Sequence, residues 1–547
     1  MLKKLILLFF ISFACLQAKT TQPPTHKPIT LEYLKQQPKG ISRDFYIWLF
    51  LQQEISPKEA SEAYKLAKNK NTKLFGLYFK KGDNKNLSLK TICERMPTSK
   101  LIKQDTNCIS KALTLKKAET LDKRTLAMLS KKLTKVNPTL SRSLAIMASK
   151  NPFNELLKEN ANFIGNFYFN LSQSFKNTHL NKPIPPKRLA QLLKEKNSTF
   201  LRMIKSAIIS QNMSVFSHSF LDLDYTNSKQ FLDYESSFYL GMNFLFIKKD
   251  SAKALPLLET SLQKSYRSLD QNRAIFWMYL ASKDTKFLTK LIEKKDVDIY
   301  SLAALELTHS KPQFNIIQKI DTKPTPATWD IKDPFEWEKI LANYKKTKNP
   351  KLLEKVNHTN TTPHFVWLSK KTGEEYFLTP YPEIFSKFSK ETQALLYALG
   401  RQESLFIPTA ISTSYALGIM QLMPFNVEAI AKDFKEDKKV GYLDMFDPNT
   451  NVRYAEYFTR PLLREFKHPL FISYAYNGGP GFTRRLLAKN YLFKKNNSLD
   501  PWYSIEMIPY EESRIYGKKV LANYIIYKRI FGFESNLLPL LEQTLIY

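Results

Sequence analysis

The sequence contains little glycine, little cysteine and no long apolar run beyond its first residues. Only 14 of its 547 residues are glycine. This scarcity argues against a turn-rich β architecture, and abundant Leu, Lys, Ala and Phe favour helices. Most of the glycines lie after residue 372. We therefore expect a long helical region followed by a compact domain with specialised loops.

Acidic residues are scarce relative to basic ones. The chain has 83 Lys and Arg against 50 Asp and Glu, which gives a net charge of +33 and a pI near 9.7. Such a charge favours an anionic partner such as nucleic acid, a membrane surface or an acidic polymer. However, the lysines are scattered and form no dense basic tract of the kind that binds nucleic acid. Solvated helix faces explain the charge equally well.

The N-terminus reads as a secretory signal in residues 1–18, MLKKLILLFFISFACLQA. Two lysines precede an apolar stretch that is too short to span a membrane. Cleavage after Ala18 would release an exported chain without a transmembrane span. Lipid attachment at Cys15 is the alternative, although the residues before this cysteine fit a lipoprotein signal poorly.

Removal of the signal leaves two cysteines, Cys93 and Cys108. In an exported protein such a pair predicts a disulfide. Two buried free thiols are the alternative. Neither cysteine stands in a motif with histidine, so we do not expect catalytic cysteine chemistry.

Helices are expected in pairs from about residue 30 to residue 310. In residues 234–265 an apolar-aromatic helix, a Lys-Asp break and a second periodic helix follow one another, and 273–307 continues the pattern. Paired helices that repeat in this way predict a solenoid, in which each pair buries its face against its neighbours. Four prolines within residues 310–335 then break the helical pattern and indicate a linker.

A single carboxylate stands in the stretch GRQESLFIPTAISTSYALGIMQ. A helix that begins at Ser389 would place Leu396 and Leu399 on one buried stripe, and Glu403 at the end of that stripe. A carboxylate there loses hydration, which raises its pKa and lets it donate a proton near neutral pH. The other interpretation is a helix-end glutamate paired with Arg401, and periodicity alone favours that pairing.

Short motifs surround this glutamate at compatible spacings. They are Glu403-Ser404 with Ser412 nine residues after the glutamate, Gly418-Ile419-Met420-Gln421, Ala475-Tyr476-Asn477, and the segment EMIPYEESRIY from Glu506 to Tyr516. Together they make residues 395–525 resemble the soluble lytic transglycosylases of Gram-negative envelopes, whose catalytic domain is similar to goose-type lysozyme. The chain departs from the family motifs by Ile419 in place of Leu and Ser513 in place of Thr.

The resemblance implies a fold. We expect a mainly α protein with an N-terminal α-superhelical solenoid, which in the family's larger members forms a ring, followed by a lysozyme-like α-rich catalytic domain. The expected domains are a signal peptide (1–18), the solenoid (19–310), a helical linker domain (311–370) and the transglycosylase domain (371–547). Residues 20–230 carry no motif of the family.

The resemblance also implies a reaction. Lytic transglycosylases cleave the β-1,4 bond between N-acetylmuramic acid and N-acetylglucosamine in peptidoglycan without water, which leaves a 1,6-anhydro end. Glu403 would act first as the acid and then as the base. Hydrolytic glycosidases usually need two carboxylates, and no other acid occurs between residues 400 and 427.

The GIMQ motif and Ser412 are candidate substrate-binding residues. Gly418 would let a sugar ring approach the backbone, and Met420 would offer an apolar surface to the sugar. The amide of Gln421 would bind acetamido or hydroxyl groups. Ser412 would hold an acetamido oxygen or the Glu403 carboxyl.

Three further candidates lie near the C-terminus. Tyr476 would donate its hydroxyl near the reacting centre, whereas Asn477 would shape the loop that follows it. Glu512 would either contact substrate or brace the pocket through an ion pair with Arg514.

We expect no cofactor or metal, because the histidines are scattered and no HExxH or phosphate-binding glycine loop occurs. The expected partners are peptidoglycan glycan strands, with other cell-wall enzymes as further candidates, and not nucleic acid. We expect a periplasmic monomer. A hydrolytic muramidase that uses the same Glu403, or a non-catalytic murein-binding helical scaffold, are the alternative functions.

Overall fold

Helices dominate the computed structural model, which describes residues 28–82, 89–369, 374–434, 440–495 and 497–546. The mainly α fold class is confirmed. The predicted signal segment 1–18, with Cys15, lies outside the described residues. Of the helices in the described residues, none is long and apolar enough to cross a membrane.

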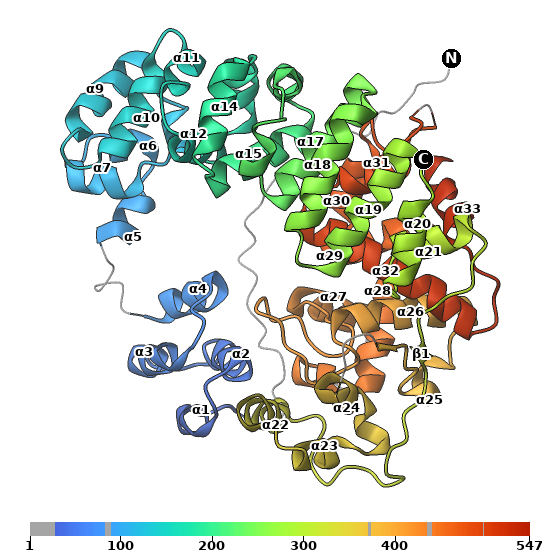
Figure 1. The fold of residues 1–547 in the computed structure, drawn as a ribbon. Helices are drawn as coiled ribbons and strands as arrows, with labels where there is room; N and C mark the ends of the chain where they lie inside the picture. The colour runs from blue at the N-terminus through green and yellow to red at the C-terminus, as the bar shows by residue number, and fades with distance from the viewer. Residues whose placement is uncertain (1–27, 83–88, 370–373, 435–439, 496, 547) are drawn as a thin grey trace, which may run out of the picture.

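The N-terminal half consists of short helices joined by short turns (Figure 1). The first four are α1 (Leu31–Gln36), α2 (Ile41–Phe50), α3 (Pro57–Leu66) and α4 (Thr72–Lys81). The solenoid follows with α5 (Leu89–Glu94), α6 (Thr98–Leu101), α7 (Thr106–Ala112), α8 (Leu115–Ala118), α9 (Lys123–Leu133), α10 (Pro138–Ala148), α11 (Pro152–Leu156), α12 (Ala161–Phe169), α13 (Gln173–Phe175), η2 (Lys176–Leu180), α14 (Pro186–Lys194), α15 (Ser198–Ser210), α16 (Ser214–His218), η3 (Ser219–Asp222), η4 (Lys229–Phe231), α17 (Tyr234–Asn243), η5 (Phe244–Lys248), α18 (Ser251–Lys264), α19 (Ser268–Ser282), α20 (Lys286–Glu293) and α21 (Ile299–Leu307).

The C-terminal half begins with a small linker region and ends with the domain that carries the motifs. The linker region contains β1 (Ile316–Ile317), α22 (Pro334–Thr347), α23 (Lys351–Val356), η6 (Thr359–Thr361) and α24 (Thr362–Ser369). The last domain contains β2 (Glu375–Tyr376), α25 (Pro382–Phe385), α26 (Lys390–Glu403), α27 (Pro424–Phe434), η7 (Leu443–Phe446), α28 (Pro448–Phe466), α29 (Pro469–Gly478), α30 (Pro480–Leu487), α31 (Trp502–Glu506), α32 (Glu511–Ile530), α33 (Leu537–Glu542) and η8 (Gln543–Ile546). Strand β1 pairs in parallel with β2, a contact between linker and last domain that the sequence did not predict.

Side-chain caps set where many helices of the N-terminal half begin. Ser56 and Asp233 each form a capping box with the third residue of the following helix. Asn197 and Asp298 likewise accept hydrogen bonds from backbone N–H groups in the first turns of α15 and α21. Such caps satisfy backbone donors that a helix leaves free at its start. They explain how short helices can follow one another so closely.

The helix pair expected in residues 234–265 is present as α17, η5 and α18. Lys249 follows η5 in a left-handed conformation with φ of 53°. Asp250 then caps α18. The Lys-Asp break therefore reverses the chain direction, and α17 and α18 pack side by side.

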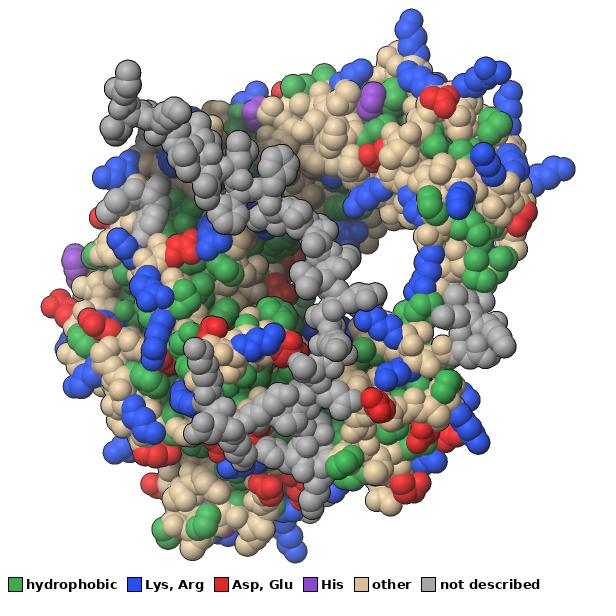
Figure 2. Space-filling model, turned by 180° about the vertical axis from the view of Figure 1, so that it is seen from behind, with side chains coloured by type: hydrophobic (Ala, Val, Ile, Leu, Met, Phe, Trp, Pro, Cys, Tyr) green, Lys and Arg blue, Asp and Glu red, His purple; other side chains and the backbone are tan. Residues whose placement is uncertain are grey.

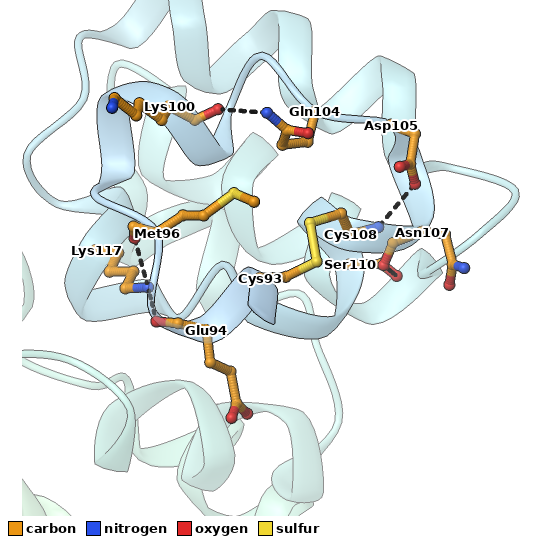
Figure 3. Close-up of a disulfide and its surroundings, with 10 residues drawn as sticks. All are labelled: Cys93, Glu94, Met96, Lys100, Gln104, Asp105, Asn107, Cys108, Ser110 and Lys117. Carbon is orange, nitrogen blue, oxygen red and sulfur yellow. Dashed lines mark hydrogen bonds between the residues drawn. A yellow bond between two sulfur atoms is a disulfide. The ribbon is translucent and has the colours of Figure 1, made fainter. Parts of the chain in front are cut away.

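A disulfide joins helices α5 and α7 near the start of the solenoid (Figure 3). It links Cys93 and Cys108, whose Cα atoms are 5.5 Å apart. Both cysteines are buried. Beside the disulfide, Lys117 Nζ donates a hydrogen bond of 2.9 Å to the carbonyl of Glu94 at the end of α5.

The two ends of the N-terminal half both contact the C-terminal half. At one end, the rings of Phe45 and Trp48 on α2 pack against Tyr415, and Trp48 also packs against Tyr442. At the other end, helices α19 and α21 pack against α31 and α32 through the contacts described next. Figure 2 shows an opening through the molecule, between the contact made by α2 and the contact made by α19 and α21. Both ends of the N-terminal half thus contact the C-terminal half.

A buried carboxylate, Glu506 at the end of α31, holds the last helices of the solenoid to the C-terminal domain. Lys518 Nζ on α32 donates to both of its oxygens at 2.7 Å. Tyr300 of α21 donates to the same carboxylate, and Arg273 of α19 lies 3.8 Å from it. Burial alone would raise the pKa of Glu506, but the two cations hold it below its ordinary value.

We expect Glu506→Ala to destabilise the protein by about 3–5 kcal/mol, because it would leave the buried ammonium of Lys518 without its counter-charge and Arg273 with only Asp270. A lowered midpoint of thermal unfolding measures the loss. Glu465→Ala is the matched control, because Glu465 pairs with Arg484 on an exposed surface, where ion pairs contribute little. Equal midpoints for the two variants would contradict a joining role for Glu506.

Candidate active site

Helix α26 places Glu403 at its C-terminal end, at the floor of a cleft. Ser389 caps the helix by accepting from Thr392 N, and Leu396 and Leu399 are fully buried, as the stripe predicted. Glu403 itself is partly buried. The carboxylate therefore lies where the buried face of the helix meets the surface.

The other interpretation of Glu403, an ion pair with Arg401, is wrong. The Arg401 guanidinium pairs with Glu375 at 2.7 Å and donates to Asn523 Oδ1 at 2.7 Å and to the Tyr376 carbonyl at 2.9 Å. It also lies over the ring of Phe377. Arg401 is thus fully engaged by neighbours other than Glu403.

A phenolic hydroxyl contacts Glu403 instead. Tyr516 of α32 donates to Glu403 Oε1 at 2.6 Å. Burial raises the pKa of Glu403 to about 7, with a smaller upward contribution from the negative charge of Glu512, while the Tyr516 hydrogen bond opposes the shift. Glu403 can therefore hold a proton near neutral pH and release it to a substrate.

The loop after Glu403 has an unusual backbone. Leu405, Phe406, Tyr415 and Gln421 all have φ between 49° and 64°. This left-handed region costs free energy for residues with side chains and persists where the surroundings enforce it, commonly at functional sites. The Ser404 hydroxyl helps to fix the loop by donating to the Ile419 carbonyl at 2.7 Å.

Two cavities meet at Glu403. One, of about 500 Å³, lies between this loop and helices α2, α22 and α24. The other, of about 770 Å³, lies between the loop and helices α27, α28, α29 and α32. Glu403, Ser412 and Gln421 line both. Each cavity is within the size range of typical ligand sites, and together they form a cleft with the carboxylate at its middle.

Ser412 and Gln421 line the cleft, and their polar groups also hold the loop. Ser412 Oγ accepts from the N–H groups of Ser414 and Ala416. Gln421 Nε2 donates to the carbonyls of Ala410 and Gly418 at 2.9 Å each. Both residues shape the wall of the cleft that they line.

The roles expected for Gly418 and Met420 require correction. Gly418 has φ of 76°, and a Cβ there would lie 2.3 Å from the Met445 carbonyl oxygen and 2.4 Å from Asn451 Nδ2. Glycine is thus required by close packing of the protein on itself. Met420 is fully buried in the core. Neither residue lines the cleft, so neither offers a surface to a sugar.

Tyr476 lines the larger cavity, but its hydroxyl has a protein partner. It donates to the carbonyl of Met420 at 2.7 Å. Burial and the nearby Glu403 carboxylate raise the pKa of Tyr476. Its hydroxyl therefore stays protonated and supports the backbone of the GIMQ motif from the side of the cleft.

Asn477 and Glu512 also line the larger cavity. Asn477 Oδ1 accepts a hydrogen bond from Ser513 Oγ at 2.7 Å. Its amide nitrogen donates to Glu512 Oε1 at 3.4 Å. The ion pair of Glu512 with Arg514 is absent among the contacts of the described residues. Arg514 is buried, donates to the Ile508 carbonyl and lies 3.9 Å from Glu235, so Glu512 remains exposed at the cleft.

Two site residues were missed in the sequence. Tyr516 is the last residue of the EMIPYEESRIY motif, and its place in that motif could have identified it as a site residue. Glu338 of α22 lines the smaller cavity, where its carboxylate accepts from Ser42 N at the start of α2. Burial raises the pKa of Glu338. No local pattern marks Glu338, because only the tertiary fold brings α22 to the cleft.

The comparisons with known proteins agree with the motifs. Residues 385–499 match the family described as "Transglycosylase SLT domain". The soluble lytic murein transglycosylase of Salmonella typhimurium is 30% identical over 169 residues, which cover 30% of this chain and 25% of that protein. The protein of the same name from Escherichia coli is 31% identical over 173 residues, covering 31% and 26%. The predicted resemblance to this family is confirmed, and the matched segment spans about a quarter of each relative.

Solved structures of lytic transglycosylases align with most of the chain at low similarity. A lytic transglycosylase from Pseudomonas aeruginosa gives a TM-score of 0.45 with 14% identity, covering 92% of this chain and 84% of that one. The 70 kDa soluble lytic transglycosylase from Escherichia coli gives a TM-score of 0.39 with 16% identity, covering 94% and 90%.

The raised pKa of Glu403 predicts that Glu403→Gln stabilises the protein at alkaline pH. The folded state binds the Glu403 proton more tightly than the unfolded state, so wild-type stability falls as the pH rises from the ordinary value of 4.5 through about 7. Glutamine carries no such cost and still accepts from Tyr516. The variant should gain up to about 3 kcal/mol at pH 8.

Thermal unfolding of both proteins between pH 4 and pH 8 measures this difference. At pH 4 both side chains are neutral, so the two proteins should unfold at similar temperatures. A difference that does not grow with pH would show that the carboxylate is not held in a desolvating site.

Proposed function

We propose that the protein is a peptidoglycan lytic transglycosylase. It would cleave the β-1,4 bond between N-acetylmuramic acid and N-acetylglucosamine without water and leave a 1,6-anhydro end. The observation that carries this proposal is Glu403, a carboxylate with a pKa near 7 at the middle of a cleft. The family match over residues 385–499 supports the same reaction.

In the first step Glu403 would be the general acid. Its raised pKa keeps a large fraction protonated near neutral pH, and an acid whose pKa lies near the working pH is the most effective. Its position, shared by both cavities, lets the oxygen of a bond that spans the cleft approach it. Protonation of that oxygen allows the glycosidic bond to break.

In the second step the same carboxylate would be the base. It would accept the proton from the 6-hydroxyl of the muramic acid as that oxygen attacks its own C1. The 2-acetamido group would stabilise the anomeric centre in place of a protein nucleophile, and intramolecular attack gains from proximity. Tyr516 would keep the carboxylate oriented in both steps through its hydrogen bond.

A hydrolytic muramidase is the second candidate, because Glu338 supplies another carboxylate in the smaller cavity. Hydrolysis would need that group to activate water. However, Glu338 accepts from Ser42 N at the start of α2, where a negative charge is favoured by the helix. A role in joining α22 to α2 accounts for Glu338, so the transglycosylase reaction is preferred.

Digestion of purified peptidoglycan tests the proposal. The wild-type protein should release muropeptides that are lighter by one water than hydrolysed products, and mass spectrometry distinguishes the two. Glu403→Gln should lower the rate at least a hundredfold, since acid catalysis contributes about 10²–10⁴-fold.

Glu338→Gln is the matched control, because it removes the other carboxylate of the smaller cavity. It should leave the anhydro products and the order of magnitude of the rate unchanged. Fully hydrated ends that disappear in Glu338→Gln would establish the muramidase instead. No release by the wild-type protein would favour a non-catalytic scaffold.

The pH dependence of the rate tests the role of Tyr516. Because protonated Glu403 is the active acid, kcat/KM should fall as the pH rises above about 7. Tyr516→Phe removes the hydrogen bond that favours the charged carboxylate, so the fall should move to higher pH. An unmoved profile would mean that the Tyr516 hydroxyl does not set the proton affinity of Glu403.

A further inference from the structure

We propose that the smaller cavity is a binding site for neutral sugar rings of the glycan strand, with Trp367 as its stacking surface. This inference rests on the proposed function and extends it. Trp367 lies on α24, in the linker region and outside the matched residues 385–499. The glycan site would thus be completed by a part of the chain that the family match does not include.

The first argument is continuity. The smaller cavity and the larger cavity share Glu403, Ser412 and Gln421. A linear polymer held with one of its bonds at Glu403 must continue to both sides of it. The smaller cavity is therefore the path of the strand on the side of α22 and α24.

The second argument is the aromatic wall. Trp367 is 36% exposed, whereas Trp337 of α22 is only 6% exposed and stands perpendicular to it, with 6.0 Å between ring centres. Trp337 packs in turn against the buried ring of His364. A large aromatic ring held in this way offers a rigid apolar face with a polar N–H edge. The C–H face of a sugar ring can pack on such a surface.

The third argument is charge. Among the described residues, those that line the two cavities include no lysine or arginine, in a chain of net charge +33. The smaller cavity carries the carboxyl groups of Glu403 and Glu338. Peptide stems that carry carboxylates would be disfavoured there, whereas uncharged N-acetylated sugars would not. Outside the cavity lining, Lys345 Nζ lies over the Trp367 ring, 5.3 Å from its centre, so a sugar would pack on the part of the ring that faces the cavity.

The cavity also offers a polar group without a partner in the described structure. Thr409 lines it and is 3% exposed, and its hydroxyl has no hydrogen-bond partner among the described residues. A few polar groups on a mainly apolar wall are typical of sites that orient a small ligand. The hydroxyl or acetamido groups of a sugar would suit the Thr409 hydroxyl.

The test measures binding of a peptide-free N-acetylglucosamine hexamer to the full chain carrying Glu403→Gln, by titration calorimetry. Adding Trp367→Ala should weaken binding about tenfold, which corresponds to the loss of one aromatic contact. Trp367→Phe, which keeps an aromatic ring, should retain most of the affinity. Thermal unfolding checks that each variant is folded.

Tyr266→Ala is the matched control, because Tyr266 is an aromatic residue that is 77% exposed on the solenoid and lines neither cavity. It should not change the affinity. Equal affinities for the Trp367 and Tyr266 variants would overturn the proposal. So would a loss seen only with peptide-bearing fragments, because the cavity would then hold the peptide stem.

These outcomes are separate from those of the proposed function. A wild-type protein that releases nothing from peptidoglycan while the hexamer binds through Trp367 would contradict the reaction but not the sugar site. If the protein forms anhydro products but Trp367→Ala does not change its affinity for the hexamer, the sugar site is contradicted but the reaction is not.

Discussion

The arrangement of the C-terminal domain depends on the interactions of one buried carboxylate, that of Glu506. It gathers Tyr300 and Arg273 from the solenoid and Lys518 from α32 around one pair of oxygens. Buried charges are tolerated only where such partners compensate their lost hydration. Because Lys518 follows Tyr516 by two residues on α32, the contact that attaches the solenoid also fixes the helix that reaches Glu403. The solenoid thereby supports the helix that holds Glu403.

Two glutamates in one domain show how partners decide the chemistry of the same side chain. Glu506 is surrounded by cations, and its pKa is lowered. Among the described residues Glu403 has no cation beside it, the Tyr516 hydrogen bond offsets only part of the effect of burial, and its pKa rises to about 7. The first group is a permanent anion that holds helices together. The second can gain and lose its proton near neutral pH.

Local patterns in the sequence predicted the features that depend on neighbouring residues, such as helix positions and buried helix faces. The Leu396 and Leu399 stripe located Glu403 at the end of a buried face, and the helix pair around Lys249 followed from periodicity. Roles that depend on tertiary packing were not predictable in this way. Met420 was expected at the surface but lies in the core, because the loop folds over it. Contributions from Glu338 and Trp367 come from a region without motifs, and only the fold brings them to the cleft.

Because the described lining of the cleft contains no Lys or Arg, the two stages of binding to a glycan strand would respond differently to ionic strength. Lysines spread over the outer surface would attract an anionic polymer from a distance, and dissolved salt screens such attraction beyond about 8 Å at physiological concentration. Contacts between aromatic rings and neutral sugars inside the cleft are not screened in this way. Salt would therefore lower the rate of association with the polymer but would have little effect on the dissociation of a bound strand. Specificity for the neutral parts of the strand would then persist when the ionic strength around the protein changes.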